Sequence, residues 1–164
     1  DVQSIHLIEM SAFRGGEAYY PSHFLAFLRS KADIFLVAEI EGEVVGYAIA
    51  RVRGPTPASE SKCTIEGWLH KIAVHPDWQR KGVGTGLMKE MLRRLASRDV
   101  DLIVLEVRRS NSEAQRFYER LGFRHVQIVH NFYPDREPAY RFILDRIGWK
   151  SAHLSAQRSP SMSG

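Results

Sequence analysis

The stretch "QRKGVGTGL" (Gln79–Leu87) separates a strand-like run that ends at Val74 from the clearest helical pattern of the chain, residues 83–97. The first N–H groups of a helix lack intrahelical partners, and the positive end of the helix dipole lies behind them. The cations and glycines of the stretch are Arg80, Lys81, Gly82, Gly84 and Gly86. Glycines let an anion approach the amides, and cations attract it. The stretch therefore predicts an anion site at the start of a helix.

The spacing of these glycines argues against two common nucleotide-binding loops. The phosphate loop of nucleoside triphosphatases ends in Gly-Lys-Ser/Thr, and no such step follows here. The dinucleotide motif G-x-G-x-x-G is not completed by a third glycine at the required spacing. We therefore expect neither a nucleoside triphosphatase nor a nicotinamide enzyme. A glycine-rich helix start that binds nothing stays an alternative.

Length and composition predict one soluble domain. The chain has 164 residues, of which 44% are hydrophobic, which suits one packed core and is too short for two. We expect the domain over residues 1–147 and a flexible, Ser-rich tail over residues 148–164. The single cysteine, Cys63, excludes an internal disulfide framework, and no run approaches the roughly 18 apolar residues of a membrane helix. A reducing, cytoplasmic compartment is the expected location.

Apolar periodicity and turn residues predict a mixed α/β order, α-α-β-β-β-α-β-α-β-β. The expected helices cover residues 5–13, 22–29, 83–97 and the segment from the capping-box pattern at Ser110 to Gly122. The expected strands are two within 34–52 that turn at Glu41-Gly42, then 64–74, 101–109, 123–132 and 139–145, with a Pro/Ser-rich loop at 53–62.

Two longer stretches carry a family resemblance: "IAVHPDWQRKGVGTGLM" (72–88) and "LEVRRSNSEAQRFYERLGFR" (105–124). They resemble the GNAT superfamily of acetyl-CoA-dependent N-acetyltransferases, whose cofactor motif Q/R-x-x-G-x-G/A is present at Gln79–Gly84. The resemblance covers about residues 34–145. Within the superfamily, "LEVRRSN", "FYERLGF" and "NFYPDREPAYRFILD" look like the protein N-terminal acetyltransferases, including the ribosomal-protein alanine type and the archaeal and eukaryotic catalytic subunits.

The resemblance implies a GNAT fold: a mixed, mostly antiparallel sheet with splayed central strands and helices on both faces. The strands that end at Val74 and Arg108 would splay, so that the pantetheine arm of acetyl-CoA lies between them. The pyrophosphate would bind the amides of residues 80–85, and a backbone N–H near Ala73 or Val74 would meet the acetyl carbonyl. The implied cofactor residues are Ile72, Ala73, Val74, Gln79, Arg80, Lys81, Gly82, Val83, Gly84, Thr85, Asn111 and Tyr118.

The resemblance also implies two catalytic residues. Glu106 occupies the position at which relatives carry a base that acts directly or through water, although a glutamate in an apolar strand can simply hold a buried polar partner. Tyr118 matches the tyrosine that protonates or hydrogen-bonds the departing CoA sulfur, although an ordinary core tyrosine would fit the same helical stripe. Asn111 would meet the cofactor arm or the amine, and helix capping alone would also explain it.

Substrate contacts are implied for two loops. Relatives close them over the first residues of the peptide, which here indicates Glu17, Tyr19 and Tyr20 in one loop and Tyr133 in the other. Glu17 could be an alternative or additional base, because some relatives use a carboxylate there, and each of these residues could equally be an ordinary surface residue. Glu66 and His70, on the strand that precedes the glycine loop, could also face the cleft. The histidines show no metal-ligand spacing, and Cys63 has no neighbours typical of a nucleophile, so direct transfer in a ternary complex is expected.

Three functions stay open at this point. The first is acetylation of a protein's α-amine, with acetyl-CoA as donor and possible ribosome or nascent-chain association suggested by the net charge of +4. The second keeps the donor and uses lysine or a small amine as acceptor. The third is a non-catalytic acyl-CoA-binding regulatory domain. Direct nucleic-acid binding is not expected, because no basic helix with interleaved aromatic residues is present.

Overall fold

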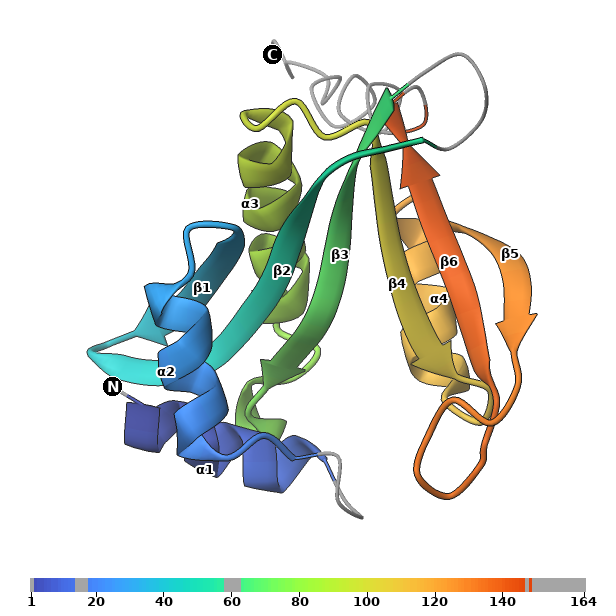
Figure 1. Ribbon diagram of the computed structural model, residues 1–164. Helices are drawn as coiled ribbons and strands as arrows, with labels where there is room; N and C mark the ends of the chain where they lie inside the picture. Colours follow the sequence, from blue (N-terminus) through green and yellow to red (C-terminus); the bar gives the residue numbers. More distant parts are fainter. Residues whose placement is uncertain (1, 14–17, 58–62, 147, 149–164) are drawn as a thin grey trace, which may run out of the picture. The chain divides into compact units, whose positions relative to one another are not determined.

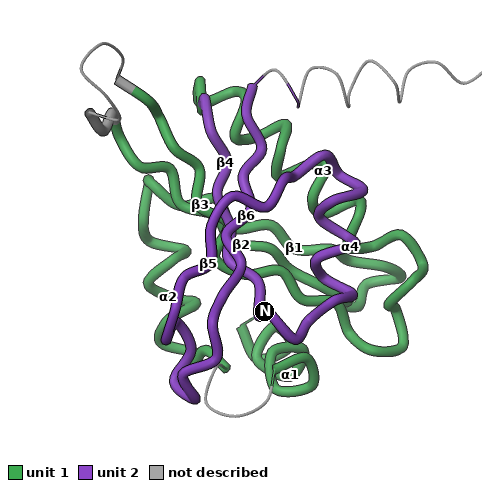
Figure 2. The backbone as a smooth tube through the Cα atoms, turned by 90° about the vertical axis from the view of Figure 1, so that its right-hand side faces the viewer, with its two compact units in different colours: residues 1–100 green, residues 101–164 purple. Residues whose placement is uncertain are grey.

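The structure is a computed structural model that describes residues 2–13, 18–57, 63–146 and 148. Its helices and strands follow the predicted order, with a short 3-10 helix η1 (Pro76–Trp78) added before the third α-helix. The chain forms two compact units, residues 1–100 and residues 101–164 (Figure 2). Apart from Gly148, the expected tail lies outside the described residues, and the expected domain limits stay a prediction.

The first unit contains three antiparallel strands in the order β1-β2-β3 (Figure 1). They are β1 (Asp33–Ile40), β2 (Glu43–Pro57) and β3 (Cys63–Val74). The predicted hairpin between β1 and β2 is confirmed, because Glu41 and Gly42 take φ values of 53° and 84°. A two-residue hairpin turn of type I′ requires positive φ at both positions.

The loop predicted for residues 53–62 is wrong for residues 53–57, and its second half lies outside the described residues. β2 continues to Pro57 and pairs with β3 there, with Thr56 opposite Thr64. The pairing shifts register between Arg53 and Thr56, so Gly54 and Pro55 lie at an irregularity where a regular ladder is interrupted. Pairing with a long partner strand thus extends β2 despite its turn-forming composition. Only residues 58–62, which lie outside the described residues, remain between the two strands.

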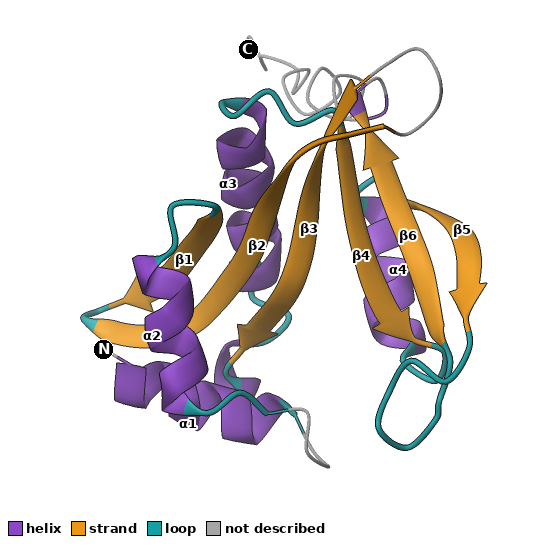
Figure 3. Ribbon diagram, in the orientation of Figure 1, coloured by secondary structure: helices purple, strands orange, loops and turns teal. Residues whose placement is uncertain are grey.

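Helices cover both faces of this three-stranded sheet (Figure 3). One face carries α1 (Val2–Ala12) and α2 (Pro21–Arg29), and the other carries α3 (Val83–Ala96). The buried cluster under α1 and α2 consists of Ile5, Ile8, Phe24, Tyr47, Ile49 and Ala73. On the opposite face, a Cβ added to Gly67 would lie 2.8 Å from Cδ2 of Leu95, so the glycine lets α3 pack closely on β3.

Some apolar residues in the predicted helix patterns face solvent. Met10 is 57% exposed, Leu25 43% and Leu28 55%. Each of the two N-terminal helices buries only a narrow stripe against the sheet, which Ile5 and Phe24 represent. The predicted stripe of α3 is confirmed for its buried members, which are Leu87, Met88, Met91, Leu92 and Leu95.

The second unit contains β4 (Leu102–Arg108), β5 (Arg124–Val129) and β6 (Ala139–Asp145), with β6 between the other two. All pairings in this unit are antiparallel. β4 is apolar on both faces, since Val104 and Leu105 are each at most 3% exposed.

Helix α4 (Ser112–Arg120) begins one residue later than the capping-box pattern predicted. Its N-cap is Asn111, whose Oδ1 accepts a hydrogen bond from the N–H of Ala114 at 3.0 Å. The N–H of Ser110, which Glu113 would bind in the predicted capping box, donates to Glu137 Oε1 at 2.7 Å. The predicted helix end is confirmed, because Gly122 has a φ of 92°, the left-handed value common after a helix.

Candidate active site

The start of α3 has the features of an anion site. Its N-cap, Gly82, has a φ of 87° and no side chain caps the helix, and no acidic residue lies in the first turn. A Cβ added to Gly82 would meet nothing within 4 Å. The first amides of α3 therefore face an approachable space with the positive end of the helix dipole behind them.

The segment before α3 is fixed by local contacts. The Gln79 side chain donates from Nε2 to the carbonyl of Val74 at 3.1 Å, which ties the loop to the end of β3. Lys81 places its Nζ 4.9 Å from the centroid of the Trp78 ring, and Arg80 adopts a positive φ of 58°. Two cationic residues thus directly precede the N-cap of α3, and their positive charge adds to the field of its first amides.

A β-bulge interrupts β3 just before the residues expected to contact the acetyl donor. Lys71 pairs with Ile49 and Leu69 pairs with Ala50, so His70 is an extra residue without a partner across the ladder. After the bulge, Ile72 pairs regularly with Ala48. The bulge brings His70 and Lys71 to the same face of the sheet, the one that α1 and α2 cover.

The two residues considered for the cleft have partners within the first unit. His70 packs its ring 5.9 Å from that of Phe27, and burial and then the Arg51 charge lower its pKa. Its Nε2 is buried and has no hydrogen-bond partner among the described residues. Glu66 accepts a hydrogen bond from Trp68 Nε1 at 2.7 Å. His70 is therefore a mostly neutral imidazole directed toward α2.

Glu106 lies in β4 and is engaged by an arginine on the neighbouring strand. Arg141 of β6 stands directly opposite it and donates to Glu106 Oε1 from Nε at 3.0 Å and from Nη2 at 2.9 Å. The Glu106 side chain is 12% exposed. Arg141 also donates from Nη1 to Gln127 of β5 at 3.1 Å, so the three side chains form one row across the sheet. The buried polar partner considered for Glu106 is therefore present.

Tyr118 is buried in α4. Its ring lies 5.7 Å from Phe123, and burial, followed by the proximity of Tyr133, raises its pKa well above the usual value. A phenol with a raised pKa keeps its proton at neutral pH. The side chain can therefore donate a proton or a hydrogen bond.

Glu106 and α4 lie on opposite faces of the sheet of the second unit. A Cβ added to Gly122, at the end of α4, would lie 3.5 Å from Cδ1 of Leu144 on β6, which pairs with Ile103. Side chains alternate along a strand, so Glu106, three residues after Ile103, points away from α4. Glu106 and Tyr118 therefore belong to opposite faces of the sheet of the second unit.

Tyr133 is held by a cluster at the end of β4. The guanidinium of Arg108 lies 4.0 Å from the centroid of the Tyr133 ring and also pairs with Asp135 at 2.9 Å and with Glu137. The N–H of Tyr133 donates to the carbonyl of Glu137 at 3.2 Å. The loop between β5 and β6 thus has a defined shape, in which Tyr133 is only partly exposed.

The two tyrosines before α2 differ in their environment. Tyr19 is partly buried, with its ring 6.0 Å from Phe24 and 5.7 Å from Phe27. Tyr20 is 70% exposed and precedes α2 as its N-cap. Glu17 lies outside the described residues. Of the two tyrosines, Tyr19 is the one that the packing fixes more firmly.

Sequence reasoning missed a buried charge network beside Tyr19. Glu9 of α1 is 0% exposed and binds the ammonium of Lys71, the hydroxyl of Tyr47 and the N–H of Tyr19. One signal was available, because Glu9 falls four residues after Ile5 on the apolar stripe of its helix. A charged residue in such a stripe indicates a buried partner.

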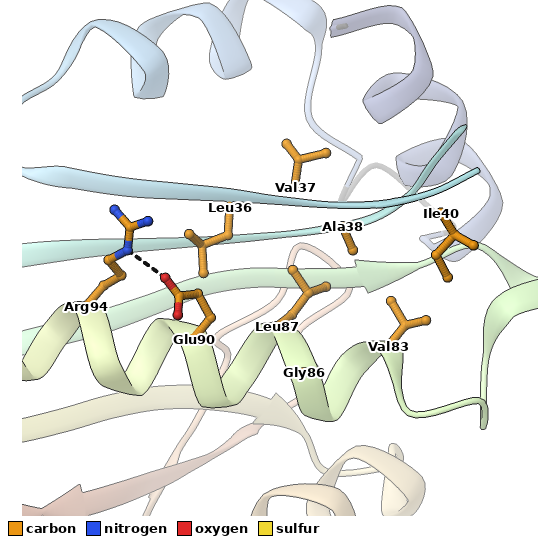
Figure 4. Close-up of a pocket in the computed structure, with 9 residues that line it drawn as sticks. All are labelled: Leu36, Val37, Ala38, Ile40, Val83, Gly86, Leu87, Glu90 and Arg94. Atoms are coloured by element: carbon orange, nitrogen blue, oxygen red, sulfur yellow. Dashed lines mark hydrogen bonds and ion pairs between the residues drawn. The ribbon is translucent and has the colours of Figure 1, made fainter. Parts of the chain in front are cut away.

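A cavity of about 410 Å³ lies between β1 and α3 (Figure 4). Its lining is mostly apolar and comprises Leu36, Val37, Ala38, Ile40, Val83, Gly86, Leu87, Glu90 and Arg94. The two charged residues at one end of the cavity pair with each other, because Arg94 Nε donates to Glu90 Oε1 at 2.7 Å. Val83 alone belongs to the residues predicted from the sequence, so this cavity is not the predicted site.

The described residues contain no group of three or more His, Cys, Asp or Glu side chains that could hold a metal ion. Among the helices that the structure describes, none is both long and apolar enough to span a membrane.

The family assignment rests on a match over most of the chain. Residues 2–123 match the family described as acetyltransferase (GNAT). The chain belongs to the acetyltransferase (GNAT) family. This GNAT chain is accordingly an N-acetyltransferase with the mixed α/β GNAT fold. The family resemblance predicted from residues 72–88 and 105–124 is confirmed.

Relatives of this GNAT chain include enzymes named for the α-amine. An N-alpha-acetyltransferase of Sulfurisphaera tokodaii is 34% identical over 143 residues, 85% of this chain and 84% of the relative. The crystal structure of the ribosomal-protein-S18-alanine N-acetyltransferase from Escherichia coli has a TM-score of 0.73 and 30% identity, and covers 88% of this chain and 87% of that one. Arabidopsis thaliana NAA60 in complex with acetyl-CoA shares the fold at 18% identity and a TM-score of 0.77, with coverage of 90% and 94%.

Proposed function

We propose that this chain is an acetyl-CoA-dependent protein N-terminal acetyltransferase that transfers the acetyl group directly in a ternary complex. The observation that carries the proposal is the similarity over 85% of the chain to a protein named N-alpha-acetyltransferase. The start of α3, which no side chain caps, supports acetyl-CoA as the donor. The pyrophosphate of acetyl-CoA needs backbone amides and nearby positive charge to bind.

Each unit would supply a different part of the chemistry. In the first unit, the amides of residues 80–85 would hold the pyrophosphate, and the strand Ile72–Val74 would offer backbone groups to the arm and the acetyl carbonyl. Gln79 supports this arrangement by fixing the loop to Val74. In the second unit, Asn111, Glu106 and Tyr118 would act on the arm, the amine and the sulfur. The bound donor supplies an activated acetyl group as a thioester.

Glu106 would accept the proton that the α-amine loses as its nitrogen bonds to the acetyl carbon. The Arg141 guanidinium occupies Oε1, so Oε2 is the oxygen better suited to receive the proton, directly or through water. Attack on the acetyl carbon requires a neutral amine, so the reaction suits an acceptor that is already partly neutral at pH 7.

That requirement favours an α-amine over lysine. The pKa values of the two amines differ by about 2.4 units, so forming neutral lysine at pH 7 costs about 3.3 kcal/mol more. Tyr118 would donate its proton to the sulfur as the carbon–sulfur bond breaks. The raised pKa of Tyr118 supports this role, because the hydroxyl is protonated when the sulfur departs.

Acceptor contacts would come from Tyr19, Tyr20 and Tyr133, with Glu17 in the segment outside the described residues. Tyr19 and Tyr133 have the firmer support, because each ring is held by neighbouring side chains. A cytoplasmic location, and an association with ribosomes or nascent chains, stay predictions. The net charge of +4 would make such an association weaken as salt concentration rises.

The test is mass-detected acetyl transfer to two peptides that each carry one lysine, with a free N-terminus in one and a blocked N-terminus in the other. The proposal expects one acetyl group on the free-terminus peptide only, at its α-amine. Acetylation of the lysine in both peptides would instead make this a lysine acetyltransferase. Binding of acetyl-CoA without transfer to peptides or small amines would leave the regulatory alternative.

A further inference from the structure

Glu9 ties together three separate segments of the first unit. Its carboxylate accepts hydrogen bonds from the Tyr19 N–H at 2.7 Å, from the Tyr47 hydroxyl on β2 and from the Lys71 ammonium on β3. Its backbone carbonyl accepts from the N–H of Phe13 at 2.9 Å. Glu9 thereby holds the chain on both sides of residues 14–17.

The charges of this network are deeply buried. The side chain of Glu9 is 0% exposed and that of Lys71 is 10% exposed. The Lys71 ammonium also lies 3.8 Å from the ring centroid of Phe13 and 4.2 Å from that of Tyr19. A buried carboxylate is tolerated when it is paired and fully hydrogen-bonded, as Glu9 is. Loss of the Glu9 charge would leave the Lys71 ammonium without its counter-charge beside the two aromatic rings.

The network sets the position of Tyr19 through both its backbone and its ring. The N–H is fixed by Glu9, and the ring faces the cation that Glu9 holds. Burial and then the Glu9 charge raise the pKa of Tyr19. Lys71 directly precedes Ile72, so the same pair joins the segment that carries Tyr19 to the strand expected to contact the acetyl donor.

We propose that Glu9, through its pair with Lys71, is a positioning residue that holds Tyr19 in place to receive the acceptor peptide. This inference rests on the proposed function. Glu9 itself is enclosed and touches neither substrate. Its loss should therefore weaken peptide binding while the chemical step proceeds, and acetyl-CoA binding at the start of α3 should be unaffected.

The main experiment compares Glu9→Gln with the wild type in steady-state acetylation of a free-terminus peptide. We expect the KM for the peptide to rise about tenfold, while kcat and the KM for acetyl-CoA change less than about threefold. The matched control is Glu90→Gln, which removes an exposed carboxylate that pairs with Arg93 and Arg94. This control should match the wild type in all three constants.

Two further variants keep the inference testable if Glu9→Gln folds poorly. Glu9→Gln combined with Lys71→Met removes both buried charges, so the fold loses no counter-charge, and the peptide KM should still rise. Tyr47→Phe removes one donor and leaves the contact between Glu9 and Tyr19 intact, so its peptide KM should stay near the wild-type value.

Amide hydrogen exchange at Tyr19 gives a readout that does not depend on activity. Exchange should be at least about tenfold faster in the double variant than in the wild type, because the neutral amide oxygen of Gln accepts more weakly than a carboxylate and is no longer oriented by Lys71. Slow exchange at Tyr19 with an unchanged peptide KM overturns the inference, as does a loss confined to kcat. A wild-type enzyme that acetylates no peptide terminus would overturn the proposed function instead, while the exchange result still decides whether Glu9 fixes Tyr19.

Discussion

Arg141 donates two hydrogen bonds to a single oxygen of Glu106, from Nε at 3.0 Å and from Nη2 at 2.9 Å, across the pairing of β6 and β4. The two carboxylate oxygens of Glu106 therefore differ, because Oε1 accepts both of these hydrogen bonds and Oε2 accepts neither. A fixed carboxylate of this kind can hold a water molecule or an amine in one orientation, which is what a base in a transfer reaction requires.

Glu106→Gln should lower kcat by about a hundredfold, because the amide cannot accept the proton. The affinity for acetyl-CoA, measured by calorimetry, should be nearly unchanged. Gln127→Ala is the matched control, since it removes the other partner of the same arginine and leaves Glu106 in place. Equal kcat values for Glu106→Gln and the wild type from pH 6 to 9 would contradict the role of Glu106.

Tyr118→Phe should lower kcat and leave the fold intact, because the buried ring is kept. The pKa of Tyr118 is raised by burial, so the hydroxyl of the wild type stays protonated beyond its ordinary value near 10. Ionisation of Tyr118 should therefore cause no decline of the wild-type rate between pH 7 and 10. A pH series of single-turnover rates checks both statements, and Phe117→Leu serves as the control on the neighbouring ring.

Gly82→Ala should reduce both stability and acetyl-CoA affinity, because the φ of 87° at this position costs an alanine about 1–2 kcal/mol. Gly86→Ala is the comparison. Gly86 lies inside α3, its N–H is already bonded to the carbonyl of Gly82 at 2.9 Å, and an added Cβ meets nothing within 4 Å. The Gly86→Ala substitution should raise the free energy of unfolding by about 0.5–1 kcal/mol and leave the affinity for acetyl-CoA unchanged. Equal effects of the two substitutions would argue against the anion site.

Asp33→Asn should destabilise the first unit at pH 7 and do so progressively less as the pH falls below about 4. Arg51 donates to both oxygens of Asp33, from Nε at 2.7 Å and from Nη2 at 2.8 Å. Burial alone would raise the pKa of Asp33, but the hydrogen bonds from Arg51 and Ser30 outweigh it, so the pKa is lowered. A lowered pKa means that the stabilisation is present above the unfolded value near 3.9 and is lost as the pH falls through the folded value.

Denaturant unfolding of the wild type and Asp33→Asn at several pH values measures this linkage. The difference in unfolding free energy should be about 1.5–3 kcal/mol at pH 7. A difference that is independent of pH would show that the loss arises from packing rather than from the charge.

The elements of the fold were predictable where local chemistry decides them. The hairpin at Glu41-Gly42 and the helix end at Gly122 need positive φ, and the stripe of α3 has a regular period. The extension of β2 to Pro57 was not predictable, because it depends on pairing with β3 rather than on its own composition.

The candidate site was predictable only in part for a similar reason. The glycines and cations at the start of α3 lie next to one another in sequence, so an anion site could be predicted there from the sequence alone. Glu9 and Lys71 are 62 residues apart, and no spacing rule joins them. Arg141 likewise meets Glu106 only because β4 and β6 pair in a particular register.

The bulge at His70 changes which residues of β3 face each side of the sheet. Gly67 and Leu69 face α3 before the bulge, and Lys71 and Ala73 face the opposite side after it. If His70 were retained without the bulge, regular alternation from Leu69 would turn the lysine toward α3, away from its carboxylate. The bulge, rather than the composition of this stretch, is therefore what directs Lys71 toward Glu9.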